Sequence, residues 1–202
     1  MRAVRVVAIT AVAAALAVRV VKSRHQRFLH PKGRTFDGEL EIWGGGNTGA
    51  ALLDRPGRHR ITVRISKGLG TDGDRLDVRG IAIRVHGDAP IDLLVSTCGK
   101  GRFTRHLPVP RRDYDTVYGS ILAYRTGGDR KVYLGARMKH GVIALYVDER
   151  AVGRVTLGAE VDDPPAYNPM RHTAPDLHPT GAIHGARGLA YPLSQKWRGV
   201  KV

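Results

Sequence analysis

The chain has little cysteine: Cys98 is the single one among 202 residues. One cysteine cannot form a disulfide within the chain, and it excludes the thiolate-rich zinc and iron–sulfur sites that need several cysteines. A lone cysteine is more often a small buried apolar residue than a nucleophile. We therefore expect no catalytic role for Cys98.

Long hydrophobic runs are missing as well. The apolar, alanine-rich stretch from Val6 to Val18 is shorter than the roughly 20 residues that a membrane-spanning helix needs. Alanine favours helix, so we expect residues 1–25 to form an N-terminal helix that packs on the protein. The second interpretation is an uncleaved membrane anchor flanked by Arg5 and Arg19; no clear signal-peptide cleavage site precedes Arg19. We expect a cytoplasmic protein, with membrane association through this helix as the second choice.

Acidic residues are scarce: 18 Asp and Glu face 33 Lys and Arg, which gives a formal net charge of +15 at pH 7. One interpretation is the base composition of a GC-rich genome, which favours arginine codons. Another is an anionic partner, such as nucleic acid, an acidic membrane surface or a polyanionic cofactor. No RNA-binding or helix-turn-helix motif is visible. We favour base composition and expect no specific nucleic-acid partner.

What the sequence does contain is a series of short, β-branched, partly alternating segments after Gly33, separated by Gly, Pro and Asp clusters. This pattern is typical of antiparallel strands joined by turns. We predict a mainly β (α+β) fold, a single antiparallel β-barrel domain over residues 26–202. The expected strands are Gly38–Trp43, His59–Ser66, Gly80–Val85, Ile91–Ser96, Val132–Met138, Val142–Asp148 and Val152–Leu157.

The last part of the chain differs from this pattern. Asp162–Pro179 is polar and proline-rich, and we expect it to be irregular rather than a strand. Ala182–Trp197 is predicted to contain a short C-terminal helix.

Three separated fragments carry residues suited to chemistry. Taken singly, each fragment has an ordinary structural interpretation: a histidine in a loop, a strand with one solvent-exposed face, and an arginine–tyrosine pair on a helix. They are Arg27-Phe-Leu-His-Pro-Lys-Gly33, then Val63-Arg-Ile-Ser66 with Asp77-Val-Arg-Gly-Ile-Ala82, and Arg187-Gly-Leu-Ala-Tyr-Pro192 followed by Arg198.

Together and in this order, the fragments resemble the haem-dependent catalase-like superfamily. The resemblance covers about residues 27–96 and 186–199 and implies a catalase-like barrel that binds haem b and acts on peroxides. By this likeness His30 is the distal histidine, Ser66 orients it, and Tyr191 is the proximal iron ligand paired with Arg187. The residues that fall where the family binds haem propionates are Arg27, Arg64 and Arg198.

The chemistry of these residue types agrees with the resemblance. A tyrosine has a pKa near about 10, so an anionic ligand needs iron and a nearby cation to stabilise the phenolate. Arg187 precedes Tyr191 by four residues and would share its helix face. A neutral imidazole such as His30 can take a proton from one peroxide oxygen and return it to the other. Arginines on separate elements could hold two propionates by charge-assisted hydrogen bonds.

The sequence also departs from the family pattern. Ser96, with Thr97 beside it, stands where a catalase has an asparagine that polarises peroxide; both hydroxyls are candidate catalytic groups. Pro31 replaces a small residue after the histidine. The chain also lacks the length for the domains that build a deep substrate channel. A shallower pocket suits an organic hydroperoxide, such as a lipid hydroperoxide, as in the related allene oxide synthases.

Four other interpretations stay open. The protein could hold haem without catalysis, and it could form a homo-oligomer. Tyr167 is a rival iron ligand, although no arginine precedes it by four residues. A phosphoester hydrolase is the less favoured alternative, since the spacing of its candidate residues matches no standard metal motif. Those candidates are His172, His178, His184, Asp162, Asp163 and Asp176.

Overall fold

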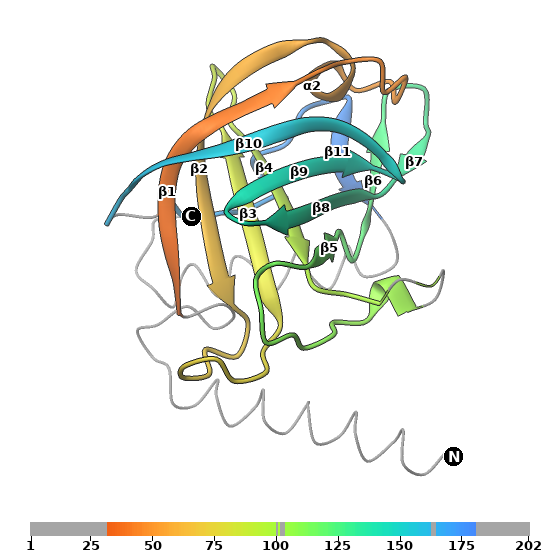
Figure 1. Cartoon of the computed structure of the whole chain (residues 1–202). Helices are drawn as coiled ribbons and strands as arrows, with labels where there is room; N and C mark the ends of the chain where they lie inside the picture. The colour runs from red at the N-terminus through yellow and green to blue at the C-terminus, as the bar shows by residue number, and fades with distance from the viewer. Residues whose placement is uncertain (1–31, 100, 102–103, 163–164, 181–202) are drawn as a thin grey trace.

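The computed structural model describes residues 32–99, 101, 104–162 and 165–180 (Figure 1). These residues form a mainly β structure around a closed barrel of eight antiparallel strands. The predicted mainly β fold and antiparallel barrel are therefore confirmed. The predicted N-terminal helix (residues 1–25) and the predicted C-terminal helix lie outside the described residues. Within the described part, no helix is both long and apolar enough to span a membrane.

Neighbouring strands of the barrel are mostly consecutive in sequence, so the sheet is largely a chain of hairpins that closes where β10 pairs with β1. The order around the barrel is β1-β10-β9-β8-β5-β4-β3-β2. Its strands are β1 (Lys32–Ile42), β2 (Gly57–Lys67), β3 (Arg79–Val85), β4 (Ile91–Ser96), β5 (Val117–Gly119), β8 (Leu134–Lys139), β9 (Val142–Val147) and β10 (Arg150–Glu160).

Alternation along each strand sends apolar side chains into the barrel. On β2 the buried Ile61, Val63 and Ile65 belong to the core, together with Ile81 and Ile83 on β3. Burying each such side chain contributes roughly 1.5–3 kcal/mol. The barrel interior is therefore a packed hydrophobic core, and polar side chains at the intervening positions face outward.

A second, three-stranded sheet in the order β11-β6-β7 lies beside the barrel. It contains β6 (Ala123–Thr126), β7 (Lys131–Val132) and β11 (Leu177–Thr180). The prediction that Asp162–Pro179 contains no strand is wrong at its end, where β11 begins. Among the strands that the structure describes, β11 pairs with β6 alone, and an edge strand tolerates Pro179 because one side of the strand needs no hydrogen-bond donor.

The predicted strand Val132–Met138 is also corrected. Val132 ends β7 in the small sheet, and β8 of the barrel begins at Leu134. Asp148 accounts for the break, because its carboxylate accepts a hydrogen bond from the Tyr133 amide at 2.9 Å, and its own amide donates to the Tyr133 carbonyl at 2.7 Å. Two short helical segments complete the described elements, α2 (Ala51–Asp54) and the 3-10 turn η1 (Thr104–His106).

Candidate functional site

The predicted site residues that the structure describes lie mostly on one surface, the outward side of strands β2, β3 and β4. Residues paired across strands share a side of the sheet. Ser66 pairs with Gly80 and Gly80 pairs with Ser96, so these three form a row across the strands. We call this surface the outer face; it consists of Thr62, Arg64, Ser66, Gly80, Ala82, Arg84, Asp92, Leu94 and Ser96.

Arg64 is an outward-facing arginine that is nevertheless buried, with 7% of its surface exposed. Its Nη1 donates a hydrogen bond to Thr35 Oγ1 at 3.3 Å. Burial lowers the pKa of Arg64, because removal from water disfavours the charged form, while nearby Tyr167 acts in the opposite direction. An anionic group placed next to this guanidinium would stabilise its charge.

Ser66 and Ser96 place two hydroxyl-bearing side chains on the same row of the outer face. Ser66 is buried and its Oγ donates to the Gly80 carbonyl at 3.4 Å, a long bond. Ser96, at the end of β4, is half-buried. Because Gly80 and Ala82 lie between and beside them with almost no side chain, the middle of the outer face is lined by small groups. Gly80 is buried and Ala82 is half-buried.

Thr97 is separated from Ser96 by the alternation of the strand. It is fully buried, and its Oγ1 donates to the Val109 carbonyl at 2.7 Å while accepting a hydrogen bond from the Arg79 amide at 3.1 Å. The hydroxyl therefore joins two backbone segments at the end of the barrel. This geometry gives Thr97 a structural task.

The other predicted site residues fall outside the described part of the chain. They are His30, Arg27, Arg187, Tyr191 and Arg198.

The outer face carries a buried ionic cluster that the sequence analysis missed. Asp92 is fully buried and accepts hydrogen bonds from Arg84 Nε at 2.8 Å and Arg84 Nη2 at 2.7 Å. It also accepts a hydrogen bond from the backbone amide of Asn168 at 2.6 Å, and His172 Nδ1 lies 2.9 Å from the same carboxylate. Arg84 Nη2 further donates to the Ala166 carbonyl at 2.8 Å. Asp92 and Arg84 thus anchor the segment Ala166–His172 on the outer face.

Tyr167 belongs to this anchored segment. Its hydroxyl donates to the Thr62 carbonyl at 3.2 Å, and its ring centroid lies 5.4 Å from the Arg84 guanidinium carbon. Two arginines, Arg64 and Arg84, therefore lie near this tyrosine. In this geometry the phenol oxygen is bonded to the backbone of β2, which makes Tyr167 a packing residue of the site.

A histidine that the sequence analysis did not single out also reaches this surface. His86 Nε2 lies 2.8 Å from Thr62 Oγ1. Burial and then the charges of Arg60 and Arg84 lower the pKa of His86. This shift favours the neutral form of the ring. A histidine in the HGD turn directly after β3 was the available sequence signal.

The residues of the hydrolase alternative are scattered. Among the described residues, no three His, Cys, Asp or Glu side chains lie close enough to hold a metal ion. His172 is bound to Asp92 and Arg84, while the Asp176 carboxylate accepts a hydrogen bond from the Ala51 amide at 2.7 Å. His184 and Asp163 lie outside the described residues.

Comparison with known proteins finds no family model that matches the chain and no curated protein that matches it in sequence. The resemblance to the catalase-like superfamily therefore depends on the three sequence fragments alone.

Proposed function

We propose that this protein is a haem-binding oxidoreductase of the catalase-like type that acts on hydrogen peroxide or organic hydroperoxides. One observation carries the proposal: Arg64, Ser66 and Ser96 lie together on the outer face although up to 32 positions separate them in the sequence. The catalase-like resemblance implies that all three lie around one cofactor.

The side chains of the outer face fit a haem in their chemistry. A porphyrin needs small side chains beside its ring and cationic partners for its two carboxylates. Gly80 and Ala82 provide small groups, and Arg64 is a buried cation whose charged form a propionate would stabilise. In this proposal Arg27 and Arg198 supply the other cationic contacts, and Tyr191, supported by Arg187, is the iron ligand.

When bound, the haem iron would supply the redox chemistry of peroxide cleavage. The protein's own groups would manage protons. His30 would remove the proton from one peroxide oxygen and deliver it to the other, as a neutral imidazole can. Ser66 would fix the orientation of that ring, and the Ser96 hydroxyl would hydrogen-bond the peroxide in place of the family's asparagine.

An absorption spectrum tests the cofactor. Protein produced with haem supplied should show a ferric, tyrosinate-type visible spectrum, and Tyr191→Phe should lose it. Arg64→Leu should weaken haem binding by about tenfold or more, since a charge-assisted hydrogen bond is worth roughly 1.5–3 kcal/mol. Arg60→Leu is the matched control, because Arg60 lies on the same strand and side but is exposed. A colourless native protein, or equal haem affinity in the Arg64 and Arg60 variants, would refute this site.

Turnover distinguishes an enzyme from a haem carrier. In the enzyme, His30→Ala abolishes reaction with an organic hydroperoxide while the haem stays bound. If the native holoprotein and His30→Ala turn over the hydroperoxide equally, or if neither does, the protein binds haem without this catalysis.

A further inference from the structure

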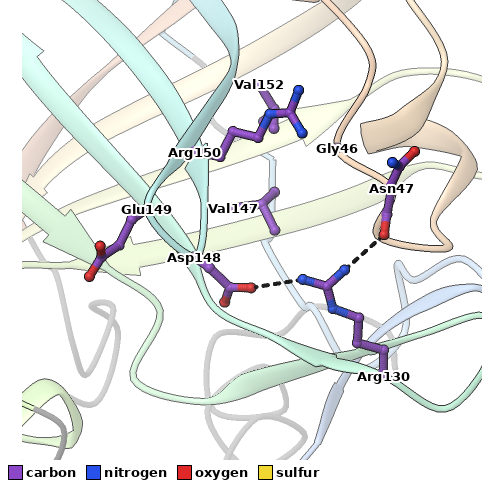
Figure 2. Close-up of a pocket in the computed structure, with 8 residues that line it drawn as sticks. All are labelled: Gly46, Asn47, Arg130, Val147, Asp148, Glu149, Arg150 and Val152. Atoms are coloured by element: carbon purple, nitrogen blue, oxygen red, sulfur yellow. Dashed lines mark hydrogen bonds and ion pairs between the residues drawn. The ribbon is translucent and has the colours of Figure 1, made fainter.

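A pocket lies between the glycine-rich loop after β1 and the hairpin that joins β9 to β10 (Figure 2). It has a volume of about 510 Å³ and contains none of the residues of the outer face. We call it the loop pocket. Its polar lining consists of Asn47, Arg130, Asp148, Glu149 and Arg150, and Gly46, Val147 and Val152 also line it.

One wall of the loop pocket is held by a set of hydrogen bonds to the Asp54 carboxylate. The Asp54 carboxylate accepts from the Thr48 amide at 2.8 Å, from Thr48 Oγ1 at 2.9 Å and from the Gly49 amide at 2.7 Å. These bonds fix the turn in which Asn47 adopts a positive φ of 46°. Because the loop is anchored from inside, the wall is preorganised rather than adaptable.

A bridge across the pocket fixes the second wall against the first. Arg130 Nη1 donates to the Asn47 carbonyl at 2.8 Å, and Arg130 Nη2 donates to Asp148 Oδ2 at 3.3 Å. Figure 2 shows this guanidinium lying between the loop and the hairpin. The charges of Arg130 and Asp148 therefore largely balance each other.

Arg150 is the cation that this balance leaves over. Its Nη2 lies 3.5 Å from the point that a Cβ on Gly45 would occupy, so the guanidinium rests over the glycine loop. Within the described part of the chain, the Arg150 side chain has no hydrogen bond or ion pair, and Figure 2 shows the carboxylate of Glu149, which also lines the pocket, directed away from that guanidinium. The pocket lining thus carries two cations and two anions, and Arg150 is the cation that no carboxylate pairs among the described residues.

We propose that the loop pocket binds a small organic monocarboxylate. The planar guanidinium of Arg150 would hold the carboxylate by two parallel hydrogen bonds. The Asn47 amide would add a donor, and Val147 and Val152 would contact the hydrocarbon part. A phosphate dianion fits less well, because Asp148 lies in the same pocket and repels a second negative charge. The proposal does not depend on haem.

Amide NMR spectra of the full chain, titrated at constant ionic strength, test the site. Sodium butyrate should shift the amide signals of Gly45 and Asn47 saturably, in the millimolar range expected for one ion-paired contact. Arg150→Gln should weaken binding about tenfold or more. Asn47→Asp, which keeps the shape and tolerates the positive φ, should weaken it too by adding a negative charge. Arg154→Gln is the control, because Arg154 is an exposed arginine on the same strand that pairs with Glu41 outside the pocket.

Three results would overturn the proposal. One is the absence of a saturable butyrate shift in the native protein. Another is unchanged butyrate affinity in Arg150→Gln with the rest of the spectrum intact. The third is tighter binding of inorganic phosphate than of butyrate, which would contradict the assigned ligand class.

Discussion

The substitution Asp92→Asn tests how much the buried ionic cluster contributes to stability. Asp92 is fully buried and the Arg84 side chain is only 12% exposed, so the variant leaves a cation in the protein without its carboxylate. The new amide group would also direct a donor at a donor. Removing one partner of a buried pair costs roughly 3–5 kcal/mol. For a protein of this size, we expect Tm to fall by roughly 10 °C.

Urea unfolding at pH 7, followed by circular dichroism, measures this loss as a change in the free energy of unfolding. Glu160→Gln is the control: its pair with Arg34 joins side chains that are 44% and 70% exposed, and such pairs contribute little. Replacing both charges, as in Arg84→Met with Asp92→Leu, should recover a large part of the stability. If Asp92→Asn costs no more than Glu160→Gln, the cluster does not anchor the segment Ala166–His172.

Three further predictions concern other parts of the barrel. Burial alone would raise the pKa of Asp54, but hydrogen bonds from Thr48 and Gly49 outweigh it and lower that pKa. The Asp54 carboxylate therefore stabilises the protein above the unfolded pKa of about 4, and this stabilisation is lost as pH falls through the folded pKa. In Asp54→Asn, the measured free energy of unfolding should depend less on pH between about pH 5 and 2. An unchanged pH dependence would contradict the role of these hydrogen bonds. Gly38→Ala should destabilise by about 1–3 kcal/mol in urea unfolding, since its Cβ would clash with the Thr156 carbonyl; a neutral or stabilising effect would show that the strands can separate. Burial raises the pKa of the Cys98 thiol, so a disulfide reagent at pH 7 should label it far more slowly in the native than in the urea-unfolded protein, and equal rates would refute its burial.

Much of the barrel could be predicted from the sequence because its strands are regular. Ile91–Ser96 was predicted with the bounds that the structure has, and Gly80–Val85 differs by one residue at its start. A β-branched, partly alternating segment bounded by turn residues is a local signal, and local signals can be read without a structure. β6 and β11 were missed because they are four residues long, and Pro179 argued against a strand.

The candidate site could be predicted only in part. The spacing of Arg64 and Ser66 on one strand places both on the same side, which the sequence shows. Their approach to Ser96 depends on the registers of two hairpins, which composition and periodicity do not specify. The pairing of Asp92 with His172 joins residues 80 positions apart, and no local pattern announces it. A charged residue inside an otherwise apolar strand, as in IDLLVS, was the available hint of a buried partner.

The long pairing of β1 with β2 runs without a shift from Lys32–Lys67 to Ile42–Gly57. Core and candidate site are therefore two sides of the same strand, and odd or even position decides which side a residue serves. Inserting one residue between Val63 and Arg64 would point the side chains of Arg64 and Ser66 into the hydrophobic core and expose Ile65. Insertions and deletions are therefore tolerated in the turns of this protein, whereas β2 tolerates substitutions but no change in its number of residues.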